Sequence, residues 1–139
     1  MAYRKKLPRT FEKFEASLKK LNESTTDKFE AKYDKDVLIE IVVKRFEYTF
    51  ESLWKLLKEV VLTEGVECAS PLGAFKEGFA LGLIDKKNED IFPLMVKKRN
   101  EIVHVYSDED AEEIYHLIKN TFTPAINNVI GNLRKTLQR

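Results

Sequence analysis

Hydrophobic residues along this chain recur at the spacing of α-helices. In the N-terminal segment they follow one another at intervals of three and four residues: Phe11, Phe14, Leu18 and Leu21. Pro8, just ahead of them, suits the start of a helix, because proline is tolerated in the first turn. The next stretch, from Asn22 to Lys35, is polar and rich in Ser and Thr, so it predicts a loop.

A long helix is predicted from about Asp36 to Thr63. Its apolar residues populate more than one face: Leu38, Ile41, Val42, Phe46, Tyr48, Phe50, Leu53, Trp54, Leu57 and Val61. Such a helix packs on several sides, as at the centre of a bundle or in a dimer interface. The β-branched residues between positions 39 and 43 are typical of a strand, but the length of the segment and its Glu, Lys and Leu content favour a helix.

Cap residues divide the second half of the chain. Ser70 followed by Pro71 predicts a helix start, and Gly82 predicts the end of that short helix. Asn88 is expected to cap the next helix, with acidic residues in its first turn. The apolar stripe of that helix is Ile91, Leu94, Met95, Ile102 and Val105.

A last helical segment begins near Ser107. Ser107 and Asp110 have the spacing of a capping box, and a helical period of apolar residues continues to the C-terminus. Pro124 interrupts this period, so a kink or a break is expected there. The pattern as a whole predicts an all-α protein, an up-and-down bundle of about five helices in a single domain spanning residues 1–139.

Composition narrows the range of functions. Of 139 residues, 43% are hydrophobic and 34% charged, which is typical of a folded domain and not of a disordered chain. The 24 basic and 23 acidic residues leave a net charge of +1, so contact with nucleic acid would need a local patch. The single cysteine, Cys68, excludes a disulfide-stapled fold and is expected in a buried position or a loop. Without a signal-peptide pattern, an apolar span, a Cys/His cluster or a Gly-rich phosphate loop, we expect a cytoplasmic protein with no metal or cofactor.

The segment from Arg99 to Tyr106 carries the candidate chemistry. On a straight helix Arg99 and Tyr106 share a face, whereas His104 is turned by about 140° from Arg99 and away from the apolar stripe. Arginine can stabilise a charged phosphorane and histidine can move a proton, which suits a phosphodiester. The structural alternative is a histidine that interacts with the helix dipole and an arginine paired with Glu101 or Asp108. The short basic run 97–99 could likewise be a solvated face or a contact for RNA phosphates.

Three segments, in order, carry a resemblance to a known family. An Arg-x4-His-x-Tyr pattern with a polar residue after the arginine resembles the signature of the HEPN superfamily; here it consists of Arg99, Asn100, His104 and Tyr106. Residues 45–55 resemble the second helix of the nucleotidyltransferase substrate-binding family, and residues 70–84 resemble its third helix. The resemblance covers about residues 8 to 135, which would be the core of the domain.

This resemblance implies a helical bundle that forms a homodimer. The polar motif would face a cleft near the dimer axis, so that the two His104 side chains converge from different subunits. A small nucleotidyltransferase subunit is the implied partner. Many such pairs are toxin and antitoxin, in which the HEPN member is a metal-independent ribonuclease. In related systems the motif tyrosine, here Tyr106, receives nucleotidyl groups.

The sequence therefore leaves three hypotheses open, of which we favour the first. The chain is the helical partner subunit of a minimal nucleotidyltransferase; or it is a metal-independent endoribonuclease; or it is a non-catalytic dimeric interaction module. In the ribonuclease, His104 would be the general acid or base and Arg99 would stabilise the transition state. Asn100 would orient the phosphate or the histidine, and Tyr106 would position RNA or be the modification site.

Overall fold

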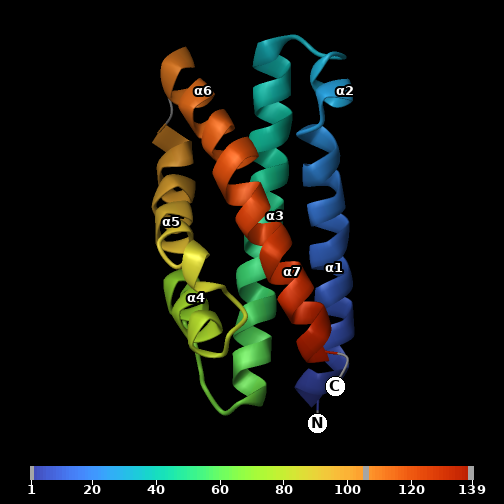
Figure 1. The fold of residues 1–139 in the computed structure, drawn as a ribbon, viewed down its shortest axis with the longest axis vertical. Helices are drawn as coiled ribbons and strands as arrows, with labels where there is room; N and C mark the ends of the chain where they lie inside the picture. The colour runs from blue at the N-terminus through green and yellow to red at the C-terminus, as the bar shows by residue number, and fades with distance from the viewer. Residues whose placement is uncertain (1, 105–106, 138–139) are drawn as a thin grey trace.

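The chain passes up and down the molecule four times (Figure 1). The computed structural model describes residues 2–104 and 107–137. Helix α1 (Ala2–Ser24) leads away from the end that holds both termini, and α3 (Lys35–Thr63) returns beside it. The short α2 (Asp27–Glu30) lies in the connection between them, so the stretch predicted as a loop contains the end of α1 and one helical turn. Pro8 lies inside α1, which begins earlier than predicted.

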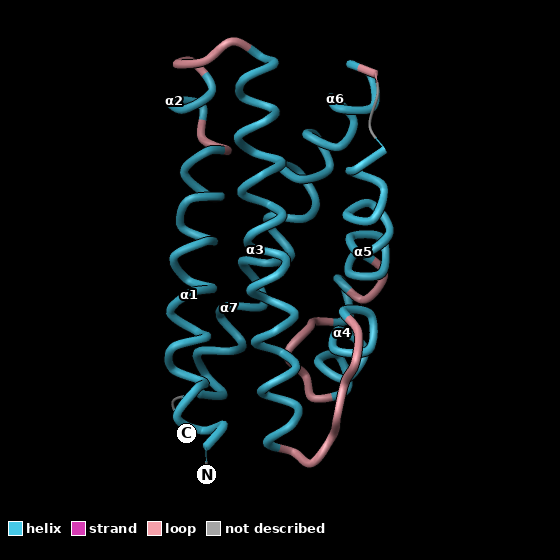
Figure 2. Tube along the Cα trace, turned by 180° about the vertical axis from the view of Figure 1, so that it is seen from behind, coloured by secondary structure: helices cyan, strands magenta, loops and turns pink. Residues whose placement is uncertain are grey.

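The third pass consists of two helices in succession, seen also from the opposite side in Figure 2. Helix α4 (Pro71–Ala80) is followed by α5 (Ile91–Glu101), with a 3-10 turn, η1 (Lys86–Asn88), between them. A second 3-10 turn, η2 (Ile102–His104), ends α5. The fourth pass begins with α6 (Asp108–Leu117). Within the described residues the protein is all-α, as predicted, and has no strand.

Local cap chemistry places several of these boundaries. The Ser70 hydroxyl accepts a hydrogen bond from the Gly73 amide (3.1 Å), and the Ser107 hydroxyl accepts one from the Asp110 amide (3.1 Å). Gly82 has φ +79°, the left-handed conformation that glycine adopts at low cost just beyond a helix. The predicted starts of α4 and α6 and the predicted end of α4 are thereby confirmed.

The predicted cap at Asn88 is wrong. Asn88 ends η1 and is buried, and its side-chain amide donates to Asn128 of the last helix (3.4 Å). Helix α5 instead begins after Asp90, whose side chain makes no capping hydrogen bond. The asparagine is therefore used for packing between helices and not for capping.

Pro124 does not end the last helical pass. A π-helical turn, η3 (Ile118–Phe122), joins α6 to α7 (Thr123–Leu137) without an intervening loop. Proline has no amide hydrogen, and its ring crowds the carbonyl four residues earlier. The wider π turn, which ends two residues before Pro124, is a recognised way to accommodate such a disturbance inside a helix.

Helix α3 is the centre of the bundle, as its many-sided apolar pattern predicted. It contacts α1, α4 and α6. Phe46 and Phe50 are fully buried. Their rings belong to a chain of aromatic contacts. The distance between ring centroids is 5.5 Å for Phe46 and Phe122, 5.7 Å for Phe50 and Phe75, and 4.9 Å for Phe75 and Phe92. Phe92, absent from the predicted stripe of α5, is thus a core residue that links α5 to α4.

Candidate functional site

Arg99 lies in the last turn of α5 and points at α3. Its guanidinium forms an ion pair and a hydrogen bond with the carboxylate of Glu51, and its central carbon lies 5.2 Å from the ring centroid of Phe50. Both side chains of the pair are 34% exposed. Glu101 and Asp108, the carboxylates named in the structural alternative, form no ion pair with Arg99 in the described part of the chain; Glu101 lies 3.4 Å from the ammonium of Lys98.

Glu51 is the residue of this site that the sequence reasoning missed. Besides Arg99, its carboxylate accepts a hydrogen bond from the Trp54 indole (3.2 Å) and lies 3.7 Å from the Lys55 ammonium. The two local partners follow at helical spacing and could have been noted in the sequence. Three donors therefore fix this carboxylate, which in turn fixes the position of Arg99 against α3.

Asn100 stands next to Arg99 and is exposed. Its side-chain oxygen accepts a long hydrogen bond from the Arg99 guanidinium (3.4 Å). Tyr106, the last member of the predicted motif, lies outside the described residues. Arg99, Asn100 and Glu51 thus form one cluster at the junction of α3 and α5.

His104 belongs to a different surface. It ends η2 and is exposed, which agrees with the prediction that it is not a core histidine. It lines a groove of about 230 Å³ between the end of α5 and the start of α6, together with Lys98, Glu101, Asp110, Glu113 and Ile114. Lys98 lies 3.4 Å from Glu101 and 3.8 Å from Glu113.

The charges of this groove bear on its chemistry. Three carboxylates line it beside one lysine, so the groove around His104 has an excess of negative charge. A phosphate would be repelled there unless another cation entered the groove. The basic run 97–99 does not supply one as a continuous patch, because Lys98 and Arg99 both have carboxylate partners. Within one chain, therefore, Arg99 and His104 face different neighbours.

An apolar groove lies beside the motif. It has a volume of about 240 Å³ between α3, η2 and α6, and is lined by Ile39, Val43, Ile102, Ala111 and Ile114, with Glu40, Lys44 and Glu47 completing it. Val103, between Ile102 and His104, is 72% exposed. A large exposed apolar side chain next to an apolar groove is a typical feature of a protein interface.

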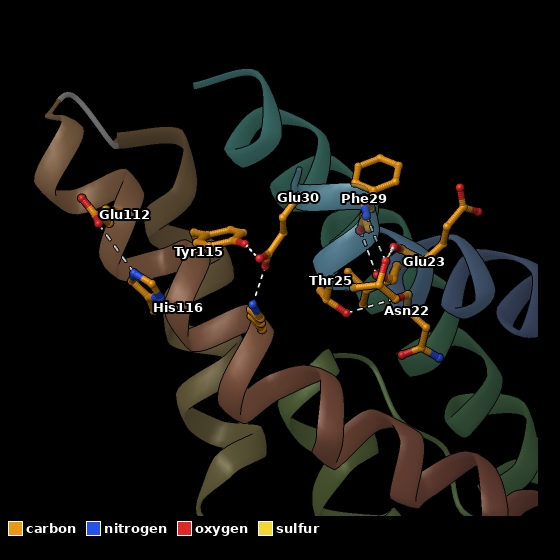
Figure 3. A network of polar contacts seen from close by, with 12 residues as sticks. Asn22, Glu23, Thr25, Phe29, Glu30, Glu112, Tyr115 and His116 are labelled. Carbon is orange, nitrogen blue, oxygen red and sulfur yellow. Dashed lines mark hydrogen bonds and ion pairs between the residues drawn. The ribbon is translucent and has the colours of Figure 1, made fainter. Parts of the chain in front are cut away.

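A partly buried polar network holds α6 to the opposite side of the bundle (Figure 3). The Tyr115 hydroxyl donates to the Glu30 carboxylate of α2 (2.5 Å), which also pairs with Lys119. The hydrogen bond from Lys119, and then that from Tyr115, lowers the pKa of Glu30, while burial and the neighbouring carboxylate raise the pKa of Tyr115. Since Ile114 and Glu113 of α6 line the His104 groove, this network helps to fix one wall of it.

Three further features of the described part of the chain concern metal ligands, membrane-spanning helices and the single cysteine. Among the described residues no three His, Cys, Asp or Glu side chains are grouped as metal ligands would be. No helix in the described part of the chain is long and apolar enough to cross a membrane. Cys68 is buried in the connection between α3 and α4, as expected, and burial raises the pKa of its thiol.

The chain is similar to known proteins both in sequence and in structure. The family model described as nucleotidyltransferase substrate binding protein like matches residues 9–135. A crystal structure of a protein from Thermus thermophilus is similar at 27% sequence identity and a TM-score of 0.73, covering 91% of this chain and 99% of that one. A comparison with curated protein sequences gave no match.

Proposed function

Because the chain belongs to the family of nucleotidyltransferase substrate binding protein like proteins, we propose that it is the helical partner subunit of a minimal nucleotidyltransferase. The match over residues 9–135 carries this proposal, since it spans all four passes of the bundle. We further propose that the pair is a toxin and its antitoxin, with this chain as the HEPN-type toxin. That assignment rests on the motif of Arg99, Asn100 and His104.

The decisive experiment is co-expression with the cognate nucleotidyltransferase. Size-exclusion chromatography at micromolar concentration should give one peak that contains both chains. Two separate peaks at that concentration would contradict the partner role.

We propose that the apolar groove beside the motif is a homodimer interface. Val103 projects from the same turn as Ile102, which lines the groove, so a second copy could cover both. Val103→Asp should shift the chain toward monomer in analytical ultracentrifugation, because a charge would be placed in an apolar contact. Leu81→Asp, the same change at an exposed apolar residue just beyond the end of α4, should leave the dimer intact. Equal behaviour of the two variants would argue against this interface.

A metal-independent ribonuclease is the second candidate function, favoured by the exposure of His104 and by the cluster of Arg99 and Asn100. The ribose 2′-hydroxyl would attack the adjacent phosphorus and the 5′-oxygen would leave, with His104 moving a proton. Arg99 would stabilise the phosphorane, Asn100 would orient the phosphate or the histidine, and Tyr106 would position RNA. Since Arg99 and His104 face different neighbours within one chain, this site would need residues from two copies.

Mixing inactive variants tests that composite site. His104→Ala should lower RNA cleavage in EDTA by about 10²- to 10⁴-fold, and Arg99→Ala should also be inactive. In a mixed dimer of the two, one composite site would retain both native residues, so re-associated mixtures should recover about a quarter of the wild-type rate. No recovery would contradict a site shared between copies. No cleavage by the wild-type dimer would favour the non-catalytic interaction module instead.

A further inference from the structure

A small groove between α1 and α3 differs in charge from three other grooves in the described part of the chain. It has a volume of about 130 Å³ and is lined by Ala16, Ser17, Lys20, Arg45 and Tyr48. Among these described residues there are two cations and two hydroxyls but no carboxylate. The His104 groove has three carboxylates, the apolar groove has two, and a groove between α4 and α5 has Glu89 and Asp90.

Arg45 is held in this groove without a carboxylate partner in the described part of the chain. Its guanidinium donates to the backbone carbonyl of Lys20 (2.7 Å) and lies 5.0 Å from the ring centroid of Phe29. These contacts fix the guanidinium but leave its charge uncompensated. In a chain with a net charge of +1, two such cations side by side are a local excess of positive charge.

The other donors of the groove are free to turn toward a ligand. Within the described residues, the side chains of Ser17 and Lys20 and the hydroxyl of Tyr48 make no hydrogen bond or ion pair. Tyr48 is 58% exposed, and the Lys44 ammonium lies 5.5 Å from its ring centroid. An exposed aromatic ring beside a cationic groove is the arrangement in which proteins stack bases of single-stranded nucleic acids.

We propose that this groove binds a phosphate group, carried by a free nucleotide or by single-stranded RNA. Arg45 and Lys20 would supply the charge, Ser17 and Tyr48 the additional hydrogen bonds, and the ring of Tyr48 a surface for a base. The groove volume of about 130 Å³ is several times the roughly 30 Å³ of a water molecule, so a phosphate group can enter it. This site depends neither on the partner-subunit role nor on catalysis by His104.

Its position extends the candidate site along α3. Tyr48 and Glu51 are three residues apart and lie about one turn from each other on the same helix. A single strand bound at Lys20 and Tyr48 would therefore pass close to Arg99. A mononucleotide would fill only the groove, and this difference separates the two sources of the phosphate.

Titration of the full chain, followed by two-dimensional amide NMR, tests the proposal. Inorganic phosphate, AMP and a short single-stranded RNA are added in separate arms. Saturable shifts should occur in residues 16–20 and 44–48. Lys20→Gln should weaken binding by roughly 3- to 10-fold, the loss of one exposed charge-assisted contact. Tyr48→Phe, which keeps the ring, should have a smaller effect.

Lys19→Gln is the matched control. Lys19 is an exposed lysine of the same helix that does not line the groove, so its removal changes the net charge equally. Equal weakening by Lys19→Gln and Lys20→Gln would overturn the proposal, and so would the absence of saturable shifts with all three ligands. RNA that binds much more tightly than AMP would identify a nucleic-acid site, and equal affinities a site for free nucleotides; either supports the groove.

Discussion

The ion pair of Glu51 and Arg99 should make a measurable contribution to the free energy of unfolding. Its two side chains are each 34% exposed, so the pair is intermediate between exposed and buried ion pairs. Exposed pairs contribute about 0.2 to 1 kcal/mol, and disruption of buried pairs costs about 3 to 5 kcal/mol. The Phe50 ring shields one face of the guanidinium, and Trp54 holds the carboxylate. We expect a coupling energy of about 1 kcal/mol.

A double-mutant cycle measures this coupling. Glu51→Ala, Arg99→Ala and the double variant are unfolded in urea and followed by far-UV circular dichroism. The protein concentration must be fixed, because association would add to the stability. Glu51→Ala alone should destabilise by about 1 to 2 kcal/mol, since it leaves the guanidinium packed on Phe50 without its carboxylate. The coupling should decrease at high salt.

The pair of Glu15 and Arg134 serves as an internal control. Its nitrogen and oxygen lie 2.9 Å apart, but its side chains are 38% and 52% exposed. Its coupling should therefore be smaller, about 0.3 kcal/mol. A Glu51–Arg99 coupling no larger than that of the control would refute the argument that Glu51 fixes Arg99 in the native chain.

Three further predictions concern the elements around the site. Tyr115→Phe should lower the free energy of unfolding by about 1 kcal/mol through the lost hydrogen bond to Glu30, and an unchanged urea midpoint would contradict this. The pKa of Glu30 is lowered in the folded state, so Glu30 stabilises the fold at pH values above its unfolded pKa of about 4.3. This stabilisation is lost as the pH falls through the folded pKa. In Glu30→Gln, the free energy of unfolding from urea titrations should therefore decrease less steeply between neutral and acidic pH than in the wild type. In urea unfolding, Ser70→Ala should cost about 1 kcal/mol by removing the cap of α4. Ser52→Ala should cost much less, because Ser52 lies inside α3 and its side chain makes no hydrogen bond in the described structure.

The architecture could be predicted because its signals are local. Periodicity identified α3, and a serine three residues before a free amide identified the starts of α4 and α6. Asn88 carried the same local signal but ends the turn η1, and α5 begins only at Ile91; its side-chain amide donates instead to Asn128, forty residues away. A residue with the sequence signal of a cap can thus serve in packing between helices, and the spacing of residues along the sequence does not reveal this.

The site was less predictable than the fold for the same reason. The sequence identified Arg99 and His104 as a pair, but their surroundings depend on which helices pass beside them. Arg99 and Glu51 are separated by 48 positions, so only the packing of α5 on α3 brings them together. Glu101, the neighbour in sequence, is bound to Lys98. Local charge patterns offered only Glu101 or Asp108 as carboxylates for the structural alternative, whereas helix packing supplies Glu51.

The proposed ribonuclease activity depends on the surface around Arg99 and His104. Phosphate binding by Arg99 requires competition with Glu51, and phosphate near His104 requires compensation for three carboxylates. If a second copy that covered Val103 also placed its Arg99 near this face, the added cation would offset the acidic groove. A nucleotidyltransferase bound over the same apolar groove would exclude that copy. The partner role and the ribonuclease role would then be alternative states of one interface, governed by which chain occupies it.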